Sequence, residues 1–188
     1  MTLVVCEGET ERIYFLAIRD LLRLRATEVV LPENTDGSAP ISVVECAERH
    51  CRNSGDYDHV YCVIDRDGHE SFARARDWIR GLANRGRRPL PIKEAVSIPC
   101  FEIWSLLHFE RTDKPYPNCG AVVNRIVAQH YAGYRKADKE TARYLVQRLE
   151  AAIDNAEWLA TRDGIEDGNP STSVHELVKH LKNVADME

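Results

Sequence analysis

The pattern of hydrophobic and polar positions changes character about halfway along the chain. Before residue 100, short apolar runs rich in β-branched residues occur at 2–6, 27–31, 58–64 and 94–98, and they predict four buried strands. Between these runs, apolar residues recur at helical spacing in segments 11–25, 41–51 and 71–83. Strands that alternate with helices are joined by right-handed crossovers, so the pattern predicts a mainly parallel sheet.

After residue 100 the periodicity is helical, with helices expected at 101–109, 121–131, 139–160 and 173–185. The predicted fold class is therefore α/β: a mainly parallel four-stranded sheet flanked by helices, with a helical C-terminal extension. We divide the chain into an α/β core over residues 1–110 and a helical part over residues 111–188 that packs on it. No apolar run approaches the roughly 20 residues that span a bilayer, so no membrane partner is expected.

Acidic side chains follow three of the four predicted strands. Glu7 comes directly after the first strand, with Glu11 one helical turn later, and Asp65 and Asp67 end the third strand. Glu102 lies just beyond the fourth strand, in the first turn of the next helix. Strand-to-helix junctions of a parallel sheet share one edge, where ligands bind, so these residues are expected to converge. Asp65 and Asp67 are two apart in an extended segment and therefore point the same way.

Carboxylates gathered at one edge repel one another unless cations bridge them. Hard oxygen ligands favour Mg²⁺ or Mn²⁺ over zinc. Two such ions roughly 3.5–4 Å apart can activate a water and stabilise the leaving oxygen of a phosphodiester. We therefore predict a metal site that is also the catalytic site, formed by Glu7, Glu11, Asp65, Asp67 and Glu102.

Each acidic element also has a simpler structural interpretation. Glu9 and Glu11 can favour a helix N-terminus electrostatically, and Glu102 can be an ordinary first-turn glutamate. The sequence D-x-D-G at Asp65–Gly68 is common in turns. Their joint placement after three separate strands favours the metal site.

Charge and cysteine content adjust this picture. The net charge of −5 is unusual for a nucleic-acid binder, although a carboxylate-rich site accounts for part of it. Basic residues are concentrated in one short segment, which can bind phosphates or form a solvated helix face. This basic window comprises Arg74, Arg76, Arg80, Arg85, Arg87, Arg88 and Lys93.

The six cysteines form no C-x-x-C pair, so a structural zinc site is not expected. Cys6, Cys62 and Cys100 lie in or beside apolar stretches as small buried hydrophobes, which favours a reduced, cytoplasmic protein.

Four segments resemble the RloB-like family. They are C-E-G-E-T-E at 6–11, V-I-D-R-D at 63–67, S-I-P-C-F-E-I-W-S-L-L-H at 97–108 and P-S-T-S-V-H-E-L-V at 170–178. The similarity covers nearly the whole chain and keeps the family's order. The family is similar to the Toprim fold of topoisomerases, primases and the nuclease domains of OLD-family proteins. This resemblance implies that residues 1–110 are a Toprim-like catalytic core.

The resemblance also implies roles for single residues. Glu7 matches the Toprim glutamate, Glu11 the second glutamate of the OLD-type motif, and Asp65 with Asp67 the Toprim D-x-D. Glu102 matches the family's F-E motif and is a further metal ligand or general base. OLD-type nucleases also use a lysine near the metals, and the candidates here are Lys136 and Lys139, each of which can equally be a solvated helix start.

Two minor features remain ambiguous in the sequence. His69 follows D-R-D-G and can reach the site, although a surface loop position is the simpler interpretation. Thr172 and Ser173 are expected to cap the last helix, with Glu176 completing a capping box.

The leading hypothesis is a nuclease that uses Mg²⁺ or Mn²⁺ to cleave DNA or RNA. The resemblance implies a bacterial phage-defence, abortive-infection or restriction-linked module, in which the protein is the effector and a partner ATPase is encoded nearby. An alternative is a non-catalytic Toprim-like adaptor that binds the ATPase or nucleic acid without cutting. Nucleotidyl transfer ranks last, because no Gly-rich phosphate loop is present. The sequence leaves open the substrate, the number of metals and the oligomeric state.

Overall fold

The protein, described here by a computed structural model, is organised around one five-stranded sheet. The structure describes residues 1–33, 39–54, 56–84, 89–162 and 168–187. The strands are β1 (Thr2–Cys6), β2 (Thr27–Val30), β3 (His59–Asp65), β4 (Ile92–Ile98) and β5 (Ser171–Thr172), in the order β2-β1-β3-β4-β5. Strands β1 to β4 are parallel, and β5 pairs antiparallel with β4. The predicted mixed α/β fold and mostly parallel sheet are confirmed. The predicted number of four strands is wrong, because the sheet has β5 as a fifth strand.

The register of the parallel strands aligns their carboxyl ends. Cys6 at the end of β1 pairs with Val63 of β3, and Asp65 at the end of β3 pairs with Ser97 of β4. The residues that follow β1, β3 and β4 therefore leave the same edge of the sheet.

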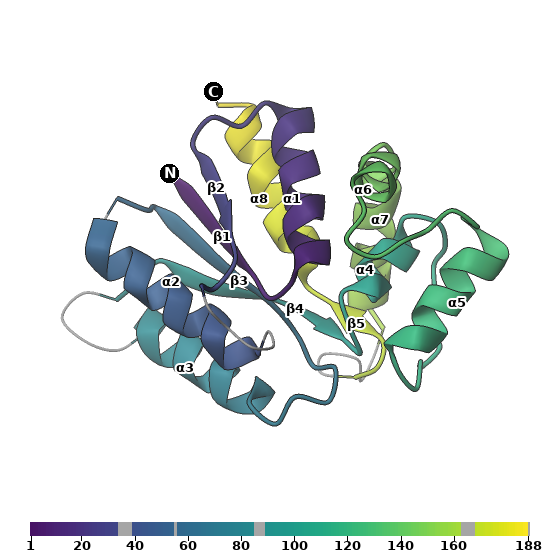
Figure 1. The fold of residues 1–188 in the computed structure, drawn as a ribbon, viewed down its shortest axis with the longest axis horizontal. Coiled ribbons are helices and arrows are strands. Elements are labelled where there is room, and N and C mark those ends of the chain that lie inside the picture. The colour runs from purple at the N-terminus through teal and green to yellow at the C-terminus, as the bar shows by residue number, and fades with distance from the viewer. Residues whose placement is uncertain (34–38, 55, 85–88, 163–167, 188) are drawn as a thin grey trace.

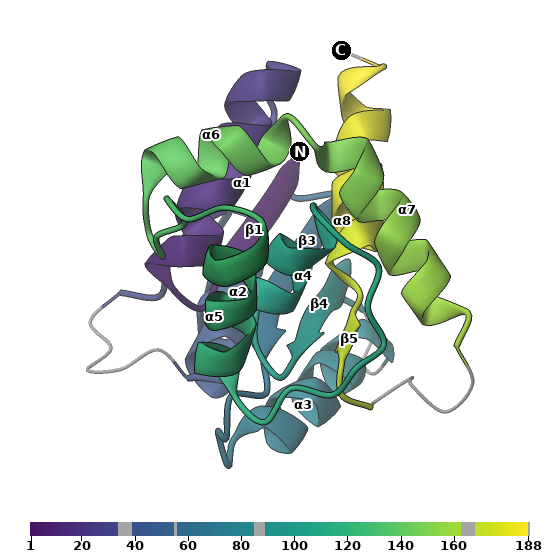
Figure 2. The same cartoon turned by 90° about the vertical axis from the view of Figure 1, so that its right-hand side faces the viewer.

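Helices cover both faces of the sheet (Figure 1). Helices α2 (Pro40–Ser54) and α3 (Phe72–Asn84) lie on one face, and α1 (Glu9–Leu22) and α8 (Val174–Ala185) lie on the other. Helices α4 (Glu102–Leu107), α5 (Cys119–Gln129), α6 (Lys139–Val146) and α7 (Leu149–Ala160) gather beside α1 and α8, as Figure 2 shows from the side. No helix of the described residues is long and apolar enough to cross a membrane.

Strand side chains alternate between two hydrophobic clusters, as the pleat of a sheet requires. On β1, Leu3 and Val5 face the cluster beneath α2 and α3, whereas Val4 and Cys6 face the other. These four side chains are fully buried, so both faces of the sheet are covered at β1. This explains why β1 has a continuous apolar sequence.

The cluster on the α1 side is continuous from the sheet to the C-terminal helices. It contains Val4 of β1, Trp104 of α4, Leu159 of α7 and Leu177 of α8. Strand β5 joins residues 171–172 to the edge of β4. Segments on either side of residue 110 therefore share one hydrophobic core.

Two expectations for the helical part were wrong. The single helix expected over 139–160 is two helices, α6 and α7, separated at Gln147 and Arg148. Ser173 precedes α8 but makes no side-chain cap hydrogen bond, because its Oγ accepts from the amide of Val96, 2.9 Å away. The Thr172 hydroxyl does accept from the amide of Val174, at 3.3 Å.

Candidate metal centre

Glu7 lies at the edge of the sheet formed by the carboxyl ends of the parallel strands. It follows β1, and its side chain is only 5% exposed. Its Oε2 accepts a hydrogen bond from the amide of Asp65 at 3.1 Å, and Oε1 lies 3.4 Å from Nε2 of His69. The end of β3 and the turn after it therefore hold this carboxyl in place.

Asp65 and Asp67 lie in different surroundings despite their close spacing. Asp65 ends β3 and accepts a hydrogen bond on Oδ2 from the amide of Phe101, 3.2 Å away. Asp67 is exposed, and its amide donates to the carbonyl of Pro99 at 2.9 Å. The chain turns at Gly68, whose φ of +77° lies in the region that favours glycine. The turn thus leaves Asp67 open to solvent and to a ligand.

Glu11 folds back over the start of α1. It is the third residue of the helix and is 7% exposed. Hydrogen bonds from the backbone amides of Glu11 and Gly8 act on its carboxyl. A Cβ at Gly8 would lie 3.1 Å from Oε2 of Glu11, so a larger residue here would require the carboxyl to shift by a few tenths of an ångström. Glu11 therefore also stabilises the N-terminus of α1, as its simpler structural interpretation suggested, because its carboxylate accepts hydrogen bonds from free backbone amides there.

Glu102 is the most deeply buried of the five, at 2% exposure. It begins α4, and its Oε1 forms an ion pair with Nζ of Lys136 at 2.8 Å, outside hydrogen-bond geometry. Burial lowers the pKa of Lys136, but the charge of Glu102 outweighs it and the pKa is raised. Of the two lysines suggested by the sequence, the structure brings Lys136 to the site.

The loop that carries Lys136 is attached to the first strand-to-helix junction. The amide of Ala137 donates to the hydroxyl of Thr10 at 3.1 Å. Ala137 has a φ of +51°, an unusual conformation for a residue with a Cβ, and Asp138 then caps α6. The role of Thr10 was not predicted, because its partner lies 127 residues away.

Burial and, after it, neighbouring negative charge raise the pKa values of three of the carboxyl groups. Burial, followed by the charge of Asp65, raises the pKa of Glu7 to about 9. Burial, with the charge of Glu11 next, raises the pKa of Asp65 to about 8. The pKa of Glu11 is raised to about 7 by burial and by Glu102. A cation bound among them would relieve this repulsion and displace the protons.

The five carboxylates face one region but do not form a closed set of ligands. Among the described residues, the one group of three metal-binding atoms within 4.8 Å of one another is Cys100, Glu102 and Cys119, not the predicted set. Mg²⁺ ordinarily keeps several waters and uses one or two carboxylates together with substrate phosphates. Separated oxygen donors such as Glu7, Asp65 and Asp67 fit an ion of this kind better than they fit zinc.

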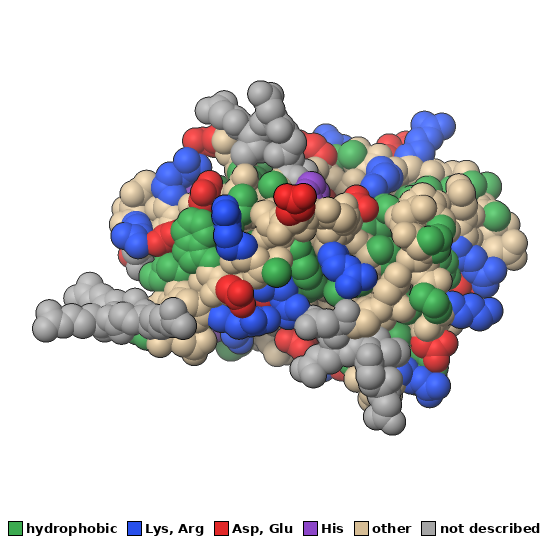
Figure 3. Space-filling view, turned by 90° about the horizontal axis from the view of Figure 1, so that it is seen from below, with side chains coloured by type: hydrophobic (Ala, Val, Ile, Leu, Met, Phe, Trp, Pro, Cys, Tyr) green, Lys and Arg blue, Asp and Glu red, His purple; other side chains and the backbone are tan. Residues whose placement is uncertain are grey.

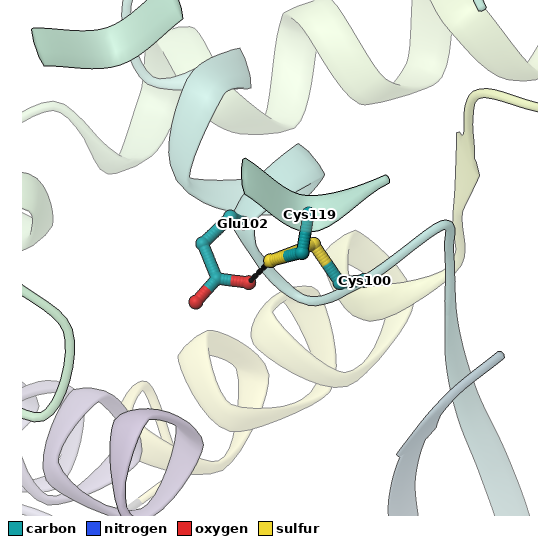
Figure 4. A group of neighbouring side chains, drawn as sticks. All are labelled: Cys100, Glu102 and Cys119. Atoms are coloured by element: carbon teal, nitrogen blue, oxygen red, sulfur yellow. Dashed lines mark hydrogen bonds between the residues drawn. A yellow bond between two sulfur atoms is a disulfide. The ribbon is translucent and has the colours of Figure 1, made fainter. Parts of the chain in front are cut away.

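Cys100 and Cys119 form a disulfide next to Glu102 (Figure 4). The sequence interpretation treated Cys100 as a small buried hydrophobe, and the pairing was missed because no spacing motif joins the two cysteines. The other four cysteines, Cys6, Cys46, Cys51 and Cys62, are free.

The basic window has fewer available charges than its sequence suggests. Arg76 pairs with Glu94 at 2.6 Å, and Arg80 pairs with Asp77 at 2.9 Å. Arg85, Arg87 and Arg88 lie outside the described residues. Seen from below, toward the ends of β1 and β3, the surface has acidic side chains and a histidine near its middle with basic side chains on either side (Figure 3).

Comparison with known proteins gives one match. A family model described as RloB-like protein matches residues 2–181. No curated protein and no solved structure matches the chain.

Proposed function

The chain belongs to the RloB-like protein family, and on this premise we propose that it is a metal-dependent nuclease that hydrolyses phosphodiester bonds of nucleic acid. The family is linked to restriction–modification and defence, so the proposed role is the effector of a bacterial defence module. The observation that carries the proposal is the group of carboxyls at the carboxyl ends of β1 and β3, where Glu7 and Glu11 are buried and burial and neighbouring negative charge raise the pKa values of Glu7 and Asp65. Such a group is unfavourable in a purely structural role and is suited to binding cations.

The proposed ligands follow from burial and position. Glu7, Asp65 and Asp67 would hold the first Mg²⁺ or Mn²⁺, because they surround the end of β3. Glu11 and Glu102 would complete a second site or orient the attacking water. A bound ion would supply a polarised water and charge stabilisation for the leaving oxygen.

Lys136 is proposed to act on the substrate. Its side chain is half-exposed, so the lysine can reach a phosphate while its Nζ lies 2.8 Å from Oε1 of Glu102. Such a fixed cation stabilises the negative charge that develops on the phosphate oxygens in the transition state. The ion pair would thus position the ammonium group of the lysine. The hydrogen bond from Ala137 to Thr10 would fix the backbone of the loop relative to the first strand-to-helix junction.

The wider assignment rests on the same features. A glutamate after β1 and a D-x-D after β3 of a parallel sheet support a Toprim-like core related to OLD-family nucleases. We further propose a cytoplasmic protein that acts on DNA or RNA together with an ATPase encoded nearby, as membership of a defence-linked family suggests.

The experiment is a cleavage assay with purified protein. Plasmid DNA, single-stranded DNA, ribosomal RNA and tRNA are incubated with Mn²⁺ or Mg²⁺, with and without the partner ATPase. Wild-type protein is expected to cut at least one substrate, and Glu7→Gln is expected to abolish cutting. Glu9→Gln is the matched control, since Glu9 lies two residues away but is exposed and pairs with Arg12.

Two results would contradict the proposal. Wild-type protein that is folded yet inert on every substrate, alone and with the ATPase, would favour the non-catalytic adaptor instead. Cleavage that persists in Glu7→Gln would place the activity outside this group of carboxyls or in a contaminant.

A further inference from the structure

The disulfide between Cys100 and Cys119 lies directly against the proposed metal centre. Cys100 precedes α4 by two residues, and Cys119 is the first residue of α5, so the bond joins the starts of two helices. Their Cα atoms are 5.7 Å apart, a separation at which cysteines can be bridged without moving the backbone. The cross-link therefore requires no rearrangement of the elements that hold Glu102.

Cys119 also contacts Glu102, and this contact depends on the oxidation state. Sγ of Cys119 lies 2.8 Å from Oε2 of Glu102, drawn as a dashed line in Figure 4. A thiol can donate a proton across this distance, whereas the sulfur of a disulfide has no proton to donate. The same positions of the atoms thus fit both the dithiol, in which Cys119 donates a hydrogen bond to Glu102, and the disulfide, in which it does not.

Burial makes the difference important for Glu102. Its carboxylate is 2% exposed, so water can hardly replace a lost partner. Lys136 engages Oε1 at 2.8 Å, and its Nζ also lies 3.5 Å from Sγ of Cys119. In the dithiol state Oε2 also accepts from the Cys119 thiol, and both oxygens are engaged. In the disulfide state Oε2 has no donor on the sulfur and is available to a cation.

We propose that Cys100 and Cys119 form a thiol–disulfide switch that controls the availability of Glu102 as a ligand in the metal centre. The proposal rests on the function proposed above. Oxidation frees Oε2 and increases metal affinity, and reduction returns the oxygen to the Cys119 thiol. Disulfides in reducing compartments are usually transient and catalytic or redox-sensing, which agrees with a switch rather than a permanent cross-link.

The oxidation step balances with a small organic disulfide, R–S–S–R, as oxidant. Cys119, at 9% exposure, is more accessible than Cys100 at 1%, so its sulfur attacks first and releases one R–SH. The sulfur of Cys100 then displaces the second R–SH from the mixed disulfide. Two S–H bonds of the protein are lost, one S–S bond forms, and two electrons and two protons pass to the oxidant.

The test compares metal binding by the two redox forms of the full chain. Protein is oxidised with glutathione disulfide or reduced with dithiothreitol, and alkylation followed by mass spectrometry reports whether Cys100 and Cys119 are bonded. Mn²⁺ affinity is then measured by calorimetry after removal of the reagent under anaerobic conditions. The disulfide form is expected to bind Mn²⁺ about tenfold more tightly, the size of effect expected for one hydrogen bond to a charged group.

Substitutions separate the hydrogen bond from the cross-link. Cys119→Ala lacks both, and it is expected to match the disulfide form and to ignore dithiothreitol. Cys119→Ser keeps a donor, and it is expected to match the dithiol form. Cys51→Ser is the control, because this free, half-buried cysteine lies on α2, so the response of the wild type should persist.

Four results would overturn the switch. Failure of the pair to oxidise, or equal Mn²⁺ affinity in both forms, contradicts the switch and leaves the proposed nuclease intact. Absence of Mn²⁺ binding in both forms contradicts the metal centre itself and therefore removes the switch with it. Tight Zn²⁺ binding by the dithiol form, with protection of both thiols from alkylation, would make Cys100, Cys119 and Glu102 a zinc site instead.

Discussion

At the scale of single residues, the proposed centre is defined by carboxyls that are protonated more readily than usual. Glu7 and Asp65 have raised pKa values because they are buried and because other carboxylates lie beside them, Asp65 for Glu7 and Glu11 for Asp65. A protonated carboxyl is a poor metal ligand, so cation binding has to expel these protons. The site is therefore expected to respond to pH in a way that exposed acidic clusters do not.

The first prediction concerns the stability of the metal-free protein. In the folded protein the pKa of Glu7 is about 9, whereas the ordinary value, which we take for the unfolded chain, is 4.5. The folded state therefore holds the proton more tightly. Stability from this group is fully present below pH 4.5 and is lost as the pH rises to about 9. Urea unfolding in the presence of a chelator should show this decline. Glu7→Gln should reduce this decline of the unfolding free energy with pH, and Glu9→Gln should leave it unchanged. If the free energy falls equally with pH in the wild type and both variants, the decline does not come from Glu7.

The second prediction concerns Lys136. If Lys136 stabilises charge on the phosphate, Lys136→Met should lower the cleavage rate by about a hundredfold to a thousandfold. Lys139→Met is the matched control, because Lys139 starts α6 three residues later and is exposed. Single-turnover cleavage rates at saturating Mn²⁺ distinguish the two, and equal losses in both variants would mean a general electrostatic effect.

At the scale of secondary-structure elements, the sequence predicted what depends on local pattern. The apolar run of β3 placed Asp65 correctly at the end of a strand, whereas Asp67 lies in the turn that follows rather than in the strand itself. Strand β5 was missed because two residues give no periodicity. The break between α6 and α7 was missed because apolar spacing continues through Gln147 and Arg148.

The contacts that the sequence could not supply are long-range. Lys136 lies 34 positions after Glu102 and meets it only because α5 and the following loop return to the sheet edge. The bond between Cys100 and Cys119 has the same origin, with a separation of 19 residues. Family resemblance suggested the lysine, whereas no motif suggested the disulfide.

The third prediction concerns the attachment of β5 and α8 to the sheet. The Ser173 hydroxyl accepts from the amide of Val96 at 2.9 Å, so Ser173→Ala leaves this amide without its partner. The expected cost is about 1–3 kcal/mol of unfolding free energy, measured by urea denaturation. Ser173→Thr keeps the oxygen and should restore most of the stability. If both variants lose the same amount, the hydroxyl is not the cause.

At the scale of the whole molecule, one core joins the sheet to α5, which begins at Cys119, and to the loop that carries Lys136. The cluster beneath α1 includes Phe101 beside Glu102, Tyr134 beside Lys136, and Cys119 itself. Because these residues pack together, the carboxylates of the strand edge and the lysine of the helical part are held as one assembly. We therefore expect truncation after residue 110 to remove metal-dependent cleavage even if the sheet still folds.

The most direct measurement of the central claim is a calorimetric titration of the disulfide form with Mn²⁺ at pH 8. Wild-type protein and Glu9→Gln are expected to bind with equal affinity and to release protons on binding. Asp65→Asn is expected to bind at least about tenfold more weakly, since even loss of a residue that supports a ligand commonly costs this much. No binding by the wild type, or the same affinity in Asp65→Asn, would contradict a metal centre at the ends of β1 and β3.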